Sequence, residues 1–113
     1  MFHSMLELVG GYEHGIGMPR WELNLVLITE FTRQFKTDFK KYQHKQEIID
    51  SLHEVLTALA NEKKLPVKCR DQSLTGNYKG SRECHVKPDV FLVYHVKDKS
   101  LIVERIGSHS ELF

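Results

Sequence analysis

Apolar side chains follow two different periods along the chain, and the first half combines one strand with helical spacing. Residues 21–29, WELNLVLIT, form a short apolar and β-branched run, which predicts a strand that is apolar on both faces and therefore buried. Four aromatic rings follow at spacings of four, four and three residues: Phe31, Phe35, Phe39 and Tyr42. This spacing places them on one face of an amphipathic helix, and Thr29 or Thr32 can supply its N-cap oxygen.

A second helix is expected from about residue 46 to residue 61. Its apolar residues keep the three-and-four spacing of a helix face: Ile48, Ile49, Leu52, Val55, Leu56 and Leu59. The link between the helices spans only residues 42–45, which predicts an antiparallel helical hairpin packed on a sheet. Both apolar stripes are interpreted as core, and neither indicates a cofactor site.

The second half of the chain alternates with the period of a strand. In residues 82–86 this alternation places Glu83 and His85 on one face, and Cys84 and Val86 on the other. The elements expected around this strand are a polar connector over residues 63–73, a central strand over 90–96, a hairpin turn over 97–100, a last strand over 101–106 and a tail over 108–113.

Pro88 cannot donate a hydrogen bond to a sheet, so it is expected to end or bend its strand and to leave Asp89 at the start of the next one. The order strand, helix, helix, strand, strand, strand predicts an α+β fold, in which the helical hairpin packs on a small, mostly antiparallel sheet. We assign one domain to residues 21–113. Residues 1–20 show no sustained period and are interpreted as a flexible leader, the product of an upstream start codon or a cloning remnant.

The composition, 41% hydrophobic and 27% charged, is ordinary for a globular protein. The longest apolar run covers only residues 25–28, against the roughly 20 residues that span a bilayer, and the N-terminus lacks the pattern of a signal peptide. These features predict a cytoplasmic protein with no membrane contact. Cys69 and Cys84 form no CxxC pair and are expected to be free thiols, with Cys84 a small core residue.

The net charge is only +1, but the positive charges are concentrated in the second half of the chain. Residues 63–105 carry ten Lys and Arg against five Asp and Glu, which gives +5. A basic region suits a partner that carries phosphates, although a solvated surface explains charge of this size equally well.

Six ionisable residues fall within this region and its tail: Arg82, Glu83, His85, Asp89, Arg105 and His109. Each costs desolvation energy beside core strands unless it is paired or left partly wet, so together they suggest a site. Taken singly, each has a structural alternative. His85 can be a satisfied histidine in the sheet, Asp89 can cap a turn, and Arg105 can be a surface charge.

These groups suit RNA cleavage in which the ribose 2′-OH is the nucleophile. Such a reaction needs a base for the 2′ proton, an acid for the leaving 5′ oxygen and a cation for the phosphoryl oxygens. Histidine suits both proton transfers, since its unperturbed pKa of about 6.5 lies near neutral pH. The chain offers His85 and His109 for these steps, while arginine has the planar fork that matches a phosphate. Glu83 and Asp89 are carboxylates able to orient a histidine, and Arg82 or Arg105 can bind the phosphate.

The same segments carry a resemblance to a known family: LTGNYKGSRECHVKPD over residues 74–89, a strand that ends in Tyr94, and RIGSHSELF over residues 105–113. They resemble the YafQ branch of the RelE superfamily of mRNA interferase toxins, and the likeness extends from about residue 23 to the C-terminus. It implies a RelE-like fold and the toxin of a type II toxin–antitoxin system. Such a toxin is an endoribonuclease that uses neither metal nor cofactor and cleaves mRNA in the ribosomal A site.

The resemblance also implies roles for individual residues. His109 matches the general acid, His85 and Asp89 match residues that take part in catalysis, and Glu83 occupies the acidic position before them. The residues implied in RNA binding are Arg105, Arg82, Lys79, Gln72 and Phe113, of which Phe113 would stack on or position a base. The implied partners are a cognate antitoxin that wraps the toxin with a helix or strand, mRNA and the ribosome, and operator DNA through the antitoxin alone.

Two departures from the family pattern bear on these roles. Some relatives carry a histidine in the connector where this chain has Gln72, which can hydrogen-bond a ribose or phosphate but cannot transfer a proton. The base is then His85 or Asp89, and the sequence does not choose between them. The second departure is the N-terminal extension, which the family pattern does not require.

Two alternatives remain open at the level of sequence. One is a non-catalytic module with a RelE-like fold that binds an antitoxin or RNA without cutting it, with Gln72 as the first sign of lost activity. The other is a metal hydrolase that uses His85, His109 and Asp89, although no closely spaced pair of histidines supports it.

Overall fold

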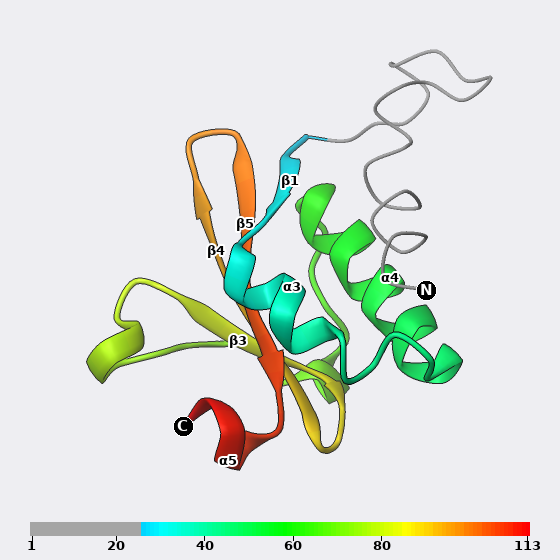
Figure 1. The fold of residues 1–113 in the computed structure, drawn as a ribbon. Coiled ribbons are helices and arrows are strands. Elements are labelled where there is room, and N and C mark those ends of the chain that lie inside the picture. The colour runs from blue at the N-terminus through cyan, green and yellow to red at the C-terminus, as the bar shows by residue number, and fades with distance from the viewer. Residues whose placement is uncertain (1–25) are drawn as a thin grey trace, which may run out of the picture.

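The computed structural model describes residues 26–113 of the chain (Figure 1). The leader expected over residues 1–20 lies outside the described residues, and so do the first five residues of the strand expected over 21–29.

A five-stranded sheet forms the centre of the molecule, with the strand order β1-β5-β4-β3-β2 (Figure 1). The strands are β1 (Ile28–Phe31), β2 (Gln72–Ser73), β3 (Arg82–Lys87), β4 (Val90–Lys97) and β5 (Ser100–Gly107). β1 runs parallel to β5, and every other neighbouring pair is antiparallel. The α+β fold with a small, mostly antiparallel sheet is therefore confirmed, with β2 as an additional short strand inside the predicted connector.

The first strand differs from the prediction. β1 lies at the edge of the sheet and begins at Ile28, later than expected. Leu27 is buried, but Val26 and Ile28 are 49% and 47% exposed, so the prediction of burial on both faces is wrong for these residues. The physical reason is the edge position, which a run of apolar residues does not reveal.

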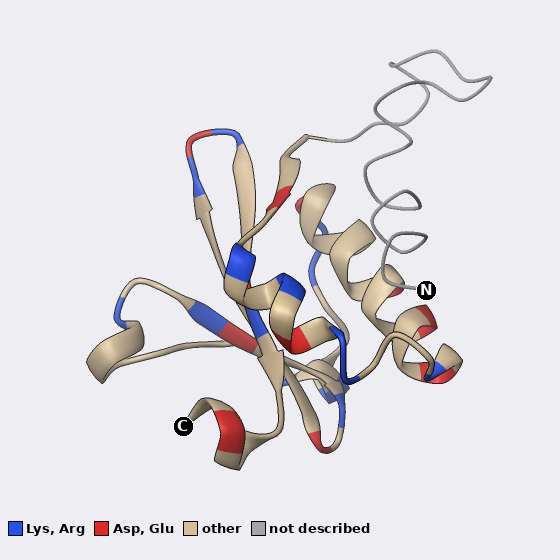
Figure 2. Ribbon diagram, in the orientation of Figure 1, with Lys and Arg blue, Asp and Glu red and all other residues tan. Residues whose placement is uncertain are grey.

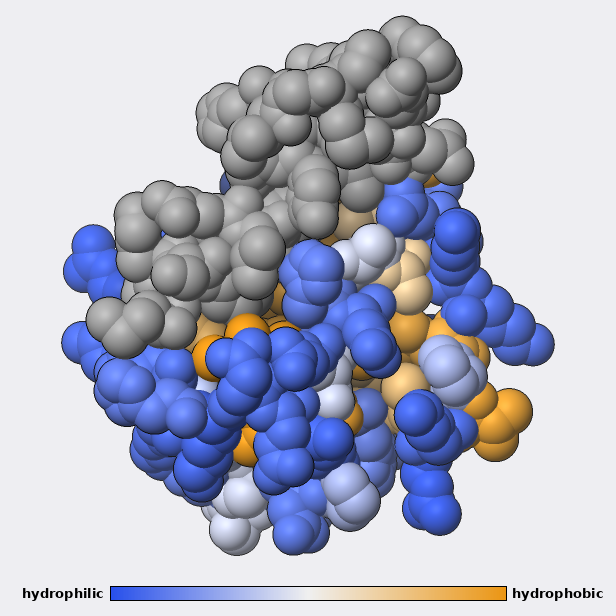
Figure 3. Space-filling model, turned by 90° about the vertical axis from the view of Figure 1, so that its right-hand side faces the viewer, coloured by the Kyte–Doolittle hydropathy of each residue, from blue (hydrophilic) through white to orange (hydrophobic). Residues whose placement is uncertain are grey.

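Within the described residues, two helices cover one face of the sheet, as predicted: α3 (Arg33–Phe39) and α4 (Gln46–Ala60). α3 is shorter than the aromatic spacing predicted, because Tyr42 lies in the turn after it. Thr32 is the N-cap of α3, and its hydroxyl accepts the Phe35 N–H at 3.0 Å. The rings of Phe35 and Phe39 are fully buried against the sheet, whereas Phe31 belongs to β1. Seen from the side on which α4 lies in Figure 1, the surface is mainly hydrophilic, with apolar side chains showing only in patches (Figure 3).

The alternation in β3 and β4 divides their side chains between two faces. Cys84 is fully buried in the main core under the helices, and both cysteines are free thiols, as predicted. Phe91 and Val93 point to the opposite face, where they form a second, smaller cluster with Leu112. The two-residue turn at 88–89 separates β3 from β4, which confirms the effect expected of the proline.

The C-terminal segment is a short helix, α5 (His109–Leu112), where the sequence predicted only a tail. Ser108 and Glu111 form a capping box at its start: the serine hydroxyl accepts the Glu111 N–H, and the glutamate accepts the Ser108 N–H at 2.8 Å. The connector before β3 also holds two short 3₁₀ helices, η2 (Val67–Cys69) and η3 (Gly76–Tyr78). Leu112 of α5 and Tyr78 of η3 join the cluster on the second face of the sheet, whereas Cys69 of η2 packs in the main core.

Candidate functional site

His85 and His109, far apart in the sequence, both contact the ring of Phe91 on the face of the sheet away from α3 and α4. The ring centroids of His85 and Phe91 are 4.3 Å apart, and those of His109 and Phe91 are 5.6 Å apart. Phe113 packs beside them, 5.1 Å from the His109 ring and 6.3 Å from the Phe91 ring. The structure therefore brings together three of the residues singled out in the sequence.

Local geometry explains how the two histidines meet. His85 lies directly opposite Phe91 across the β3–β4 hairpin, and Gly107 lies opposite Phe91 on its other side. A Cβ atom at Gly107 would approach the Leu112 side chain to 3.1 Å, so glycine lets α5 fold closely over the end of β5. The capping box at Ser108 then starts the helix, whose first residue is His109.

The exposure of these side chains suits a ligand that arrives from solvent. His109 is exposed, His85 is half-buried, and Phe113 is 44% exposed. Phe113 lies at the end of the chain, and its outer part is open to a planar group such as a base. Asp89 is also exposed, in the turn two residues before Phe91.

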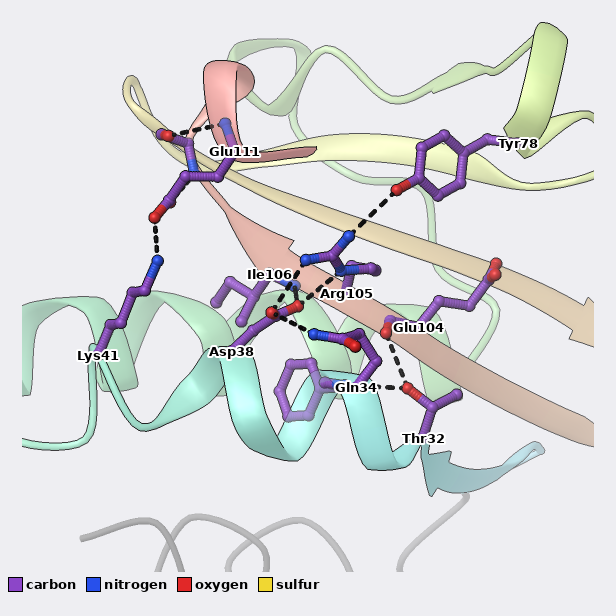
Figure 4. A network of polar contacts seen from close by, with 11 residues as sticks. Thr32, Gln34, Asp38, Lys41, Tyr78, Glu104, Arg105, Ile106 and Glu111 are labelled. Carbon is purple, nitrogen blue, oxygen red and sulfur yellow. Dashed lines mark hydrogen bonds and ion pairs between the residues drawn. The ribbon is translucent and has the colours of Figure 1, made fainter. Parts of the chain in front are cut away.

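Arg105 is held by Asp38 of α3, a residue that the sequence reading did not include in the site (Figure 4). The guanidinium donates from Nε to Oδ2 at 2.9 Å and from Nη2 to Oδ1 at 3.1 Å. Asp38 also accepts the backbone N–H of Ile106 at 3.2 Å and the Gln34 amide at 3.0 Å. The third guanidinium nitrogen donates to the Tyr78 hydroxyl at 3.4 Å.

This arrangement changes how Arg105 can act. Of the five N–H donors of a guanidinium, three are used by Asp38 and Tyr78, so two remain for a phosphate. Arg105 is therefore a fixed donor whose charge is partly balanced by Asp38, and not the solvated surface charge that was its structural alternative. Tyr78 links it to the aromatic cluster, because its ring lies 5.5 Å from the ring of Phe113.

The ion pair also shifts the acidity of both partners. Burial alone raises the pKa of Asp38, but the hydrogen bonds from Arg105, Gln34 and Ile106 outweigh burial and leave the pKa below its ordinary value. The hydrogen bonds to Asp38 raise the pKa of Arg105 above its already high value. Both groups therefore stay charged at neutral pH.

Glu83 and Gln72 lie on the same face as the histidines, further along the sheet. Gln72 of β2 is exposed and directly opposite Glu83, which in turn lies opposite Val93. Glu83 is only 6% exposed, and within residues 26–113 it makes no ion pair or side-chain hydrogen bond. A carboxylate buried in this way is a candidate to pair with a group that a ligand brings.

Arg82 and Lys79 are not brought to the histidines in the same way. The alternation of β3 puts Arg82 on the helix-covered face, where it donates to Asp71 at 3.1 Å and to Ser73 at 2.9 Å. Asp71 also accepts the Tyr94 hydroxyl at 2.6 Å. Lys79 is exposed in the loop after η3. The structure thus separates Arg82 from the cluster around Phe91.

Two further residues hold the site in place and were missed in the sequence. Lys41, just after α3, forms an ion pair with Glu111, which anchors α5 to the helical layer (Figure 4). A signal for Glu111 was present, because Ser108 and Glu111 have the spacing of a capping box. A signal for Asp38 was also present, because an acid between Phe35 and Phe39 interrupts an apolar helix face.

Glu111 is expected to make the stability of α5 sensitive to acid. The Lys41 ammonium and the Ser108 N–H hold the pKa of Glu111 well below its ordinary value of 4.5, at about 2. Because the folded pKa is lowered, the stabilisation is complete above pH 4.5 and is lost as the pH falls toward 2. Urea unfolding between pH 5 and about 2.5 should show this loss in the wild type and a smaller one in Glu111→Gln, which keeps the capping geometry.

High salt provides the control for this prediction. Lys41 and Glu111 are 61% and 35% exposed, so salt should screen the difference between the wild type and Glu111→Gln. Identical pH profiles for the two proteins at low salt would contradict the assigned ion pair.

Within residues 26–113, no three side chains of His, Cys, Asp and Glu lie close enough together to hold a metal ion. Among the helices of the same residues, none combines the length and hydrophobicity that crossing a membrane requires.

Comparison with known proteins gives a family match over most of the chain. The family described as "Bacterial toxin of type II toxin-antitoxin system, YafQ" matches residues 27–113. The mRNA interferase toxin YafQ of Escherichia coli K12 is 38% identical over 85 residues, which cover 74% of this chain and 92% of that protein.

Solved structures agree with this match. The E. coli DinJ–YafQ toxin–antitoxin complex contains a chain with a TM-score of 0.69 and 36% identity, covering 79% of this chain and 99% of that one. A metal-bound toxin from Helicobacter pylori has a TM-score of 0.68 and 40% identity, with coverages of 77% and 99%.

Proposed function

Because the chain belongs to the YafQ family of type II toxin–antitoxin toxins, we propose that it is an endoribonuclease that cleaves mRNA, presented by the ribosome in the cytoplasm. The single observation that carries the proposal is the contact of His85 and His109 with the same Phe91 ring. Two proton carriers on one small surface are what cleavage through the ribose 2′-OH needs.

In the proposed reaction, a base removes the 2′-OH proton and the 2′ oxygen attacks the adjacent phosphorus. The bond from phosphorus to the 5′ oxygen breaks, and His109 donates a proton to that leaving oxygen. The products are a 2′,3′-cyclic phosphate and a 5′-hydroxyl. His109 suits the acid because it is exposed on α5, with Phe113 packed beside its ring.

The base is His85 or Asp89, because Gln72 stands where some relatives carry a histidine and cannot itself accept the proton. His85 is half-buried against Phe91, and Asp89 is exposed in the neighbouring turn, so both are open to a ribose at the same edge of the sheet. Glu83, two residues before His85 on the same face, supports the positive charge that a histidine base acquires.

Four residues contact the RNA strand in this proposal. Arg105 directs its two remaining donors toward the phosphoryl oxygens, with Asp38 fixing its orientation. Phe113 offers its exposed ring to a base. The ribosome presents the mRNA, because a domain of this size has little surface with which to select an RNA. Gln72 and Lys79, both exposed, contact the ribose or phosphates nearby.

The proposed protein partner is an antitoxin that holds the toxin inactive and carries the pair to operator DNA. The DinJ–YafQ complex, which contains a chain similar to this one, supports such a partner. A non-catalytic module remains the second candidate, since Gln72 removes a proton carrier that some relatives have. The convergence of His85 and His109 favours the enzyme.

The proposal is tested with mRNA bound to purified ribosomes and with the purified toxin. We expect fragments that end in a 2′,3′-cyclic phosphate and a 5′-hydroxyl, and no cleavage when the ribose at the cut site carries 2′-H. Fragments with a 3′-hydroxyl would contradict attack by the 2′-OH. A chelator is then added while free magnesium is held at the level that keeps the ribosomes intact. If the chelator stops cleavage, that result would contradict the metal-independent mechanism.

A further inference from the structure

A second concave site lies along the free edge of β3, beyond the end of β2. β2 pairs only with the first two residues of β3, so no strand of residues 26–113 lies beside the rest of that edge. η2 packs against β3 there instead and leaves a pocket of about 570 Å³ between η2, α4 and the β3–β4 hairpin. Of the residues that line this pocket, only His85 has a role in the proposed mechanism.

The lining of the pocket is strongly cationic. Lys68, Arg70 and Lys87 border it together with His85. Among residues 26–113 no aspartate or glutamate is part of the lining, and two nearby acids, Asp71 and Glu54, act on the lining residue Cys69. Figure 2 shows Lys and Arg positions on both segments that enclose it, η2 and the β3–β4 hairpin. Three positive charges around one hollow repel one another, so the pocket favours a ligand with several negative charges.

The three cations are also free to bind such a ligand. Within the described residues, the side chains of Lys68, Arg70 and Lys87 make no ion pair and no hydrogen bond. Asp71, the residue after Arg70, accepts hydrogen bonds from Arg82 and Tyr94 instead. The charges of Lys68, Arg70 and Lys87 therefore stabilise the fold through no ion pair or hydrogen bond of the described residues.

His85 connects this pocket to the proposed cleavage site. It lines the pocket, and its ring also lies 4.3 Å from Phe91, which His109 contacts in turn. A strand of RNA whose reacting ribose lies at His85 would therefore place a neighbouring phosphate at the pocket.

We propose that Lys68, Arg70 and Lys87 form a subsite that binds backbone phosphates of the RNA strand next to the cleaved bond. The proposal rests on the proposed function, which supplies the RNA. The observations favour RNA over an acidic segment of a protein partner, because protein interfaces depend on apolar anchor residues. Within residues 26–113, the lining offers no large apolar side chain: Val86 and Cys69 are buried in the core, and Pro88 is the exposed apolar residue.

The test measures binding of a single-stranded oligoribonucleotide that carries 2′-O-methyl groups and so cannot be cleaved. The variant Lys68→Gln/Arg70→Gln/Lys87→Gln removes three charges from the pocket. The control Lys64→Gln/Lys97→Gln/Lys99→Gln removes three charges from exposed positions outside the pocket lining and the proposed cleavage site. Circular dichroism and thermal unfolding establish that both variants fold, and Lys87→Gln alone serves if the triple variant does not.

We expect the pocket variant to bind the oligoribonucleotide about tenfold more weakly at 50 mM salt. Each phosphate contact of a single strand contributes about 0.7 to the slope of log affinity against log salt. Loss of three contacts should therefore make this slope smaller in magnitude by about 2. The control should change both quantities much less. Unchanged affinity and slope in the pocket variant would overturn the subsite, and so would an equal loss in the control.

Two further readouts separate the possible failures. If the pocket variant binds RNA normally but loses binding of a polyglutamate peptide, the pocket belongs to an acidic protein segment and the RNA assignment is wrong. If the wild type binds RNA through the pocket but does not cut ribosome-bound mRNA, the proposed cleavage fails while the phosphate subsite stands.

Discussion

Replacing His109 with alanine is expected to lower the rate of mRNA cleavage on ribosomes by about 10²–10⁴-fold, the usual contribution of a positioned acid or base. The loss should appear in the rate of the chemical step under single-turnover conditions, with RNA affinity little changed. The exposure of His109 supports a normal fold for the variant. The pH profile adds a second readout, because removal of a general acid flattens the alkaline limb.

Two matched variants sharpen this result. His109→Gln keeps a polar side chain of similar size on α5 but cannot transfer a proton, so it should be as inactive as His109→Ala. His44→Ala removes an exposed histidine between α3 and α4, outside the proposed site, and should cleave like the wild type. Near-normal cleavage by both His109 variants would exclude His109 from the chemistry.

Replacing Asp38 with alanine is expected to reduce the free energy of unfolding by roughly 2–4 kcal/mol. The change leaves the Arg105 charge without its partner and the Ile106 N–H without its acceptor, both in a largely buried setting. Urea unfolding at neutral pH measures the loss. Cleavage should also fall, because Arg105 loses the two contacts that orient it toward the phosphate.

Asp38→Asn separates charge from shape. The amide keeps an oxygen for the Ile106 N–H but loses the ion pair, so its loss of stability should be smaller than that of Asp38→Ala. Because the folded pKa of Asp38 lies below its ordinary value of 3.8, the charge stabilises the fold fully above that pH and less as the pH falls through the lowered value. The difference between wild type and Asp38→Asn should shrink over the same interval, and a constant difference would contradict the ion pair.

The parts of the fold that depend on neighbouring residues in the sequence were predictable. The apolar spacing gave both helices, with α4 ending one residue before the expected position, and Thr32 was among the two expected caps. The alternation in β3 correctly placed Glu83 and His85 on the face opposite Cys84. These features follow from local sterics and from the periods of helix and strand.

Features that depend on distant partners were not predictable in the same way. β1 is an edge strand because β5 is its single neighbour among the described strands, and its hydrophobic run carries no sign of that position. The sequence identified Arg105 as a charged candidate, but it could not identify the partner Asp38, which lies 67 residues away along the chain. A helix of four residues has too few turns for a period, so α5 was expected as a tail despite its capping box.

The candidate site also combines features that the sequence predicted with features that only the structure shows. The sequence supplied residue types that suit RNA cleavage, and the structure places His85, His109 and Phe113 around Phe91. It places Arg82 on the opposite face, because adjacent residues of a strand point to opposite sides. The chemistry assigned to each residue remains a prediction that mutants must test.

The measurement that tests the central claim most directly is the mapping of mRNA 5′ ends in bacteria that express this chain from an inducible promoter. For the wild type we predict growth arrest and new 5′ ends inside translated codons, and for His109→Ala at the same protein level we predict neither. Intact mRNA and normal growth with well-expressed wild-type protein would contradict the proposed cleavage, and so would the same new ends in both strains.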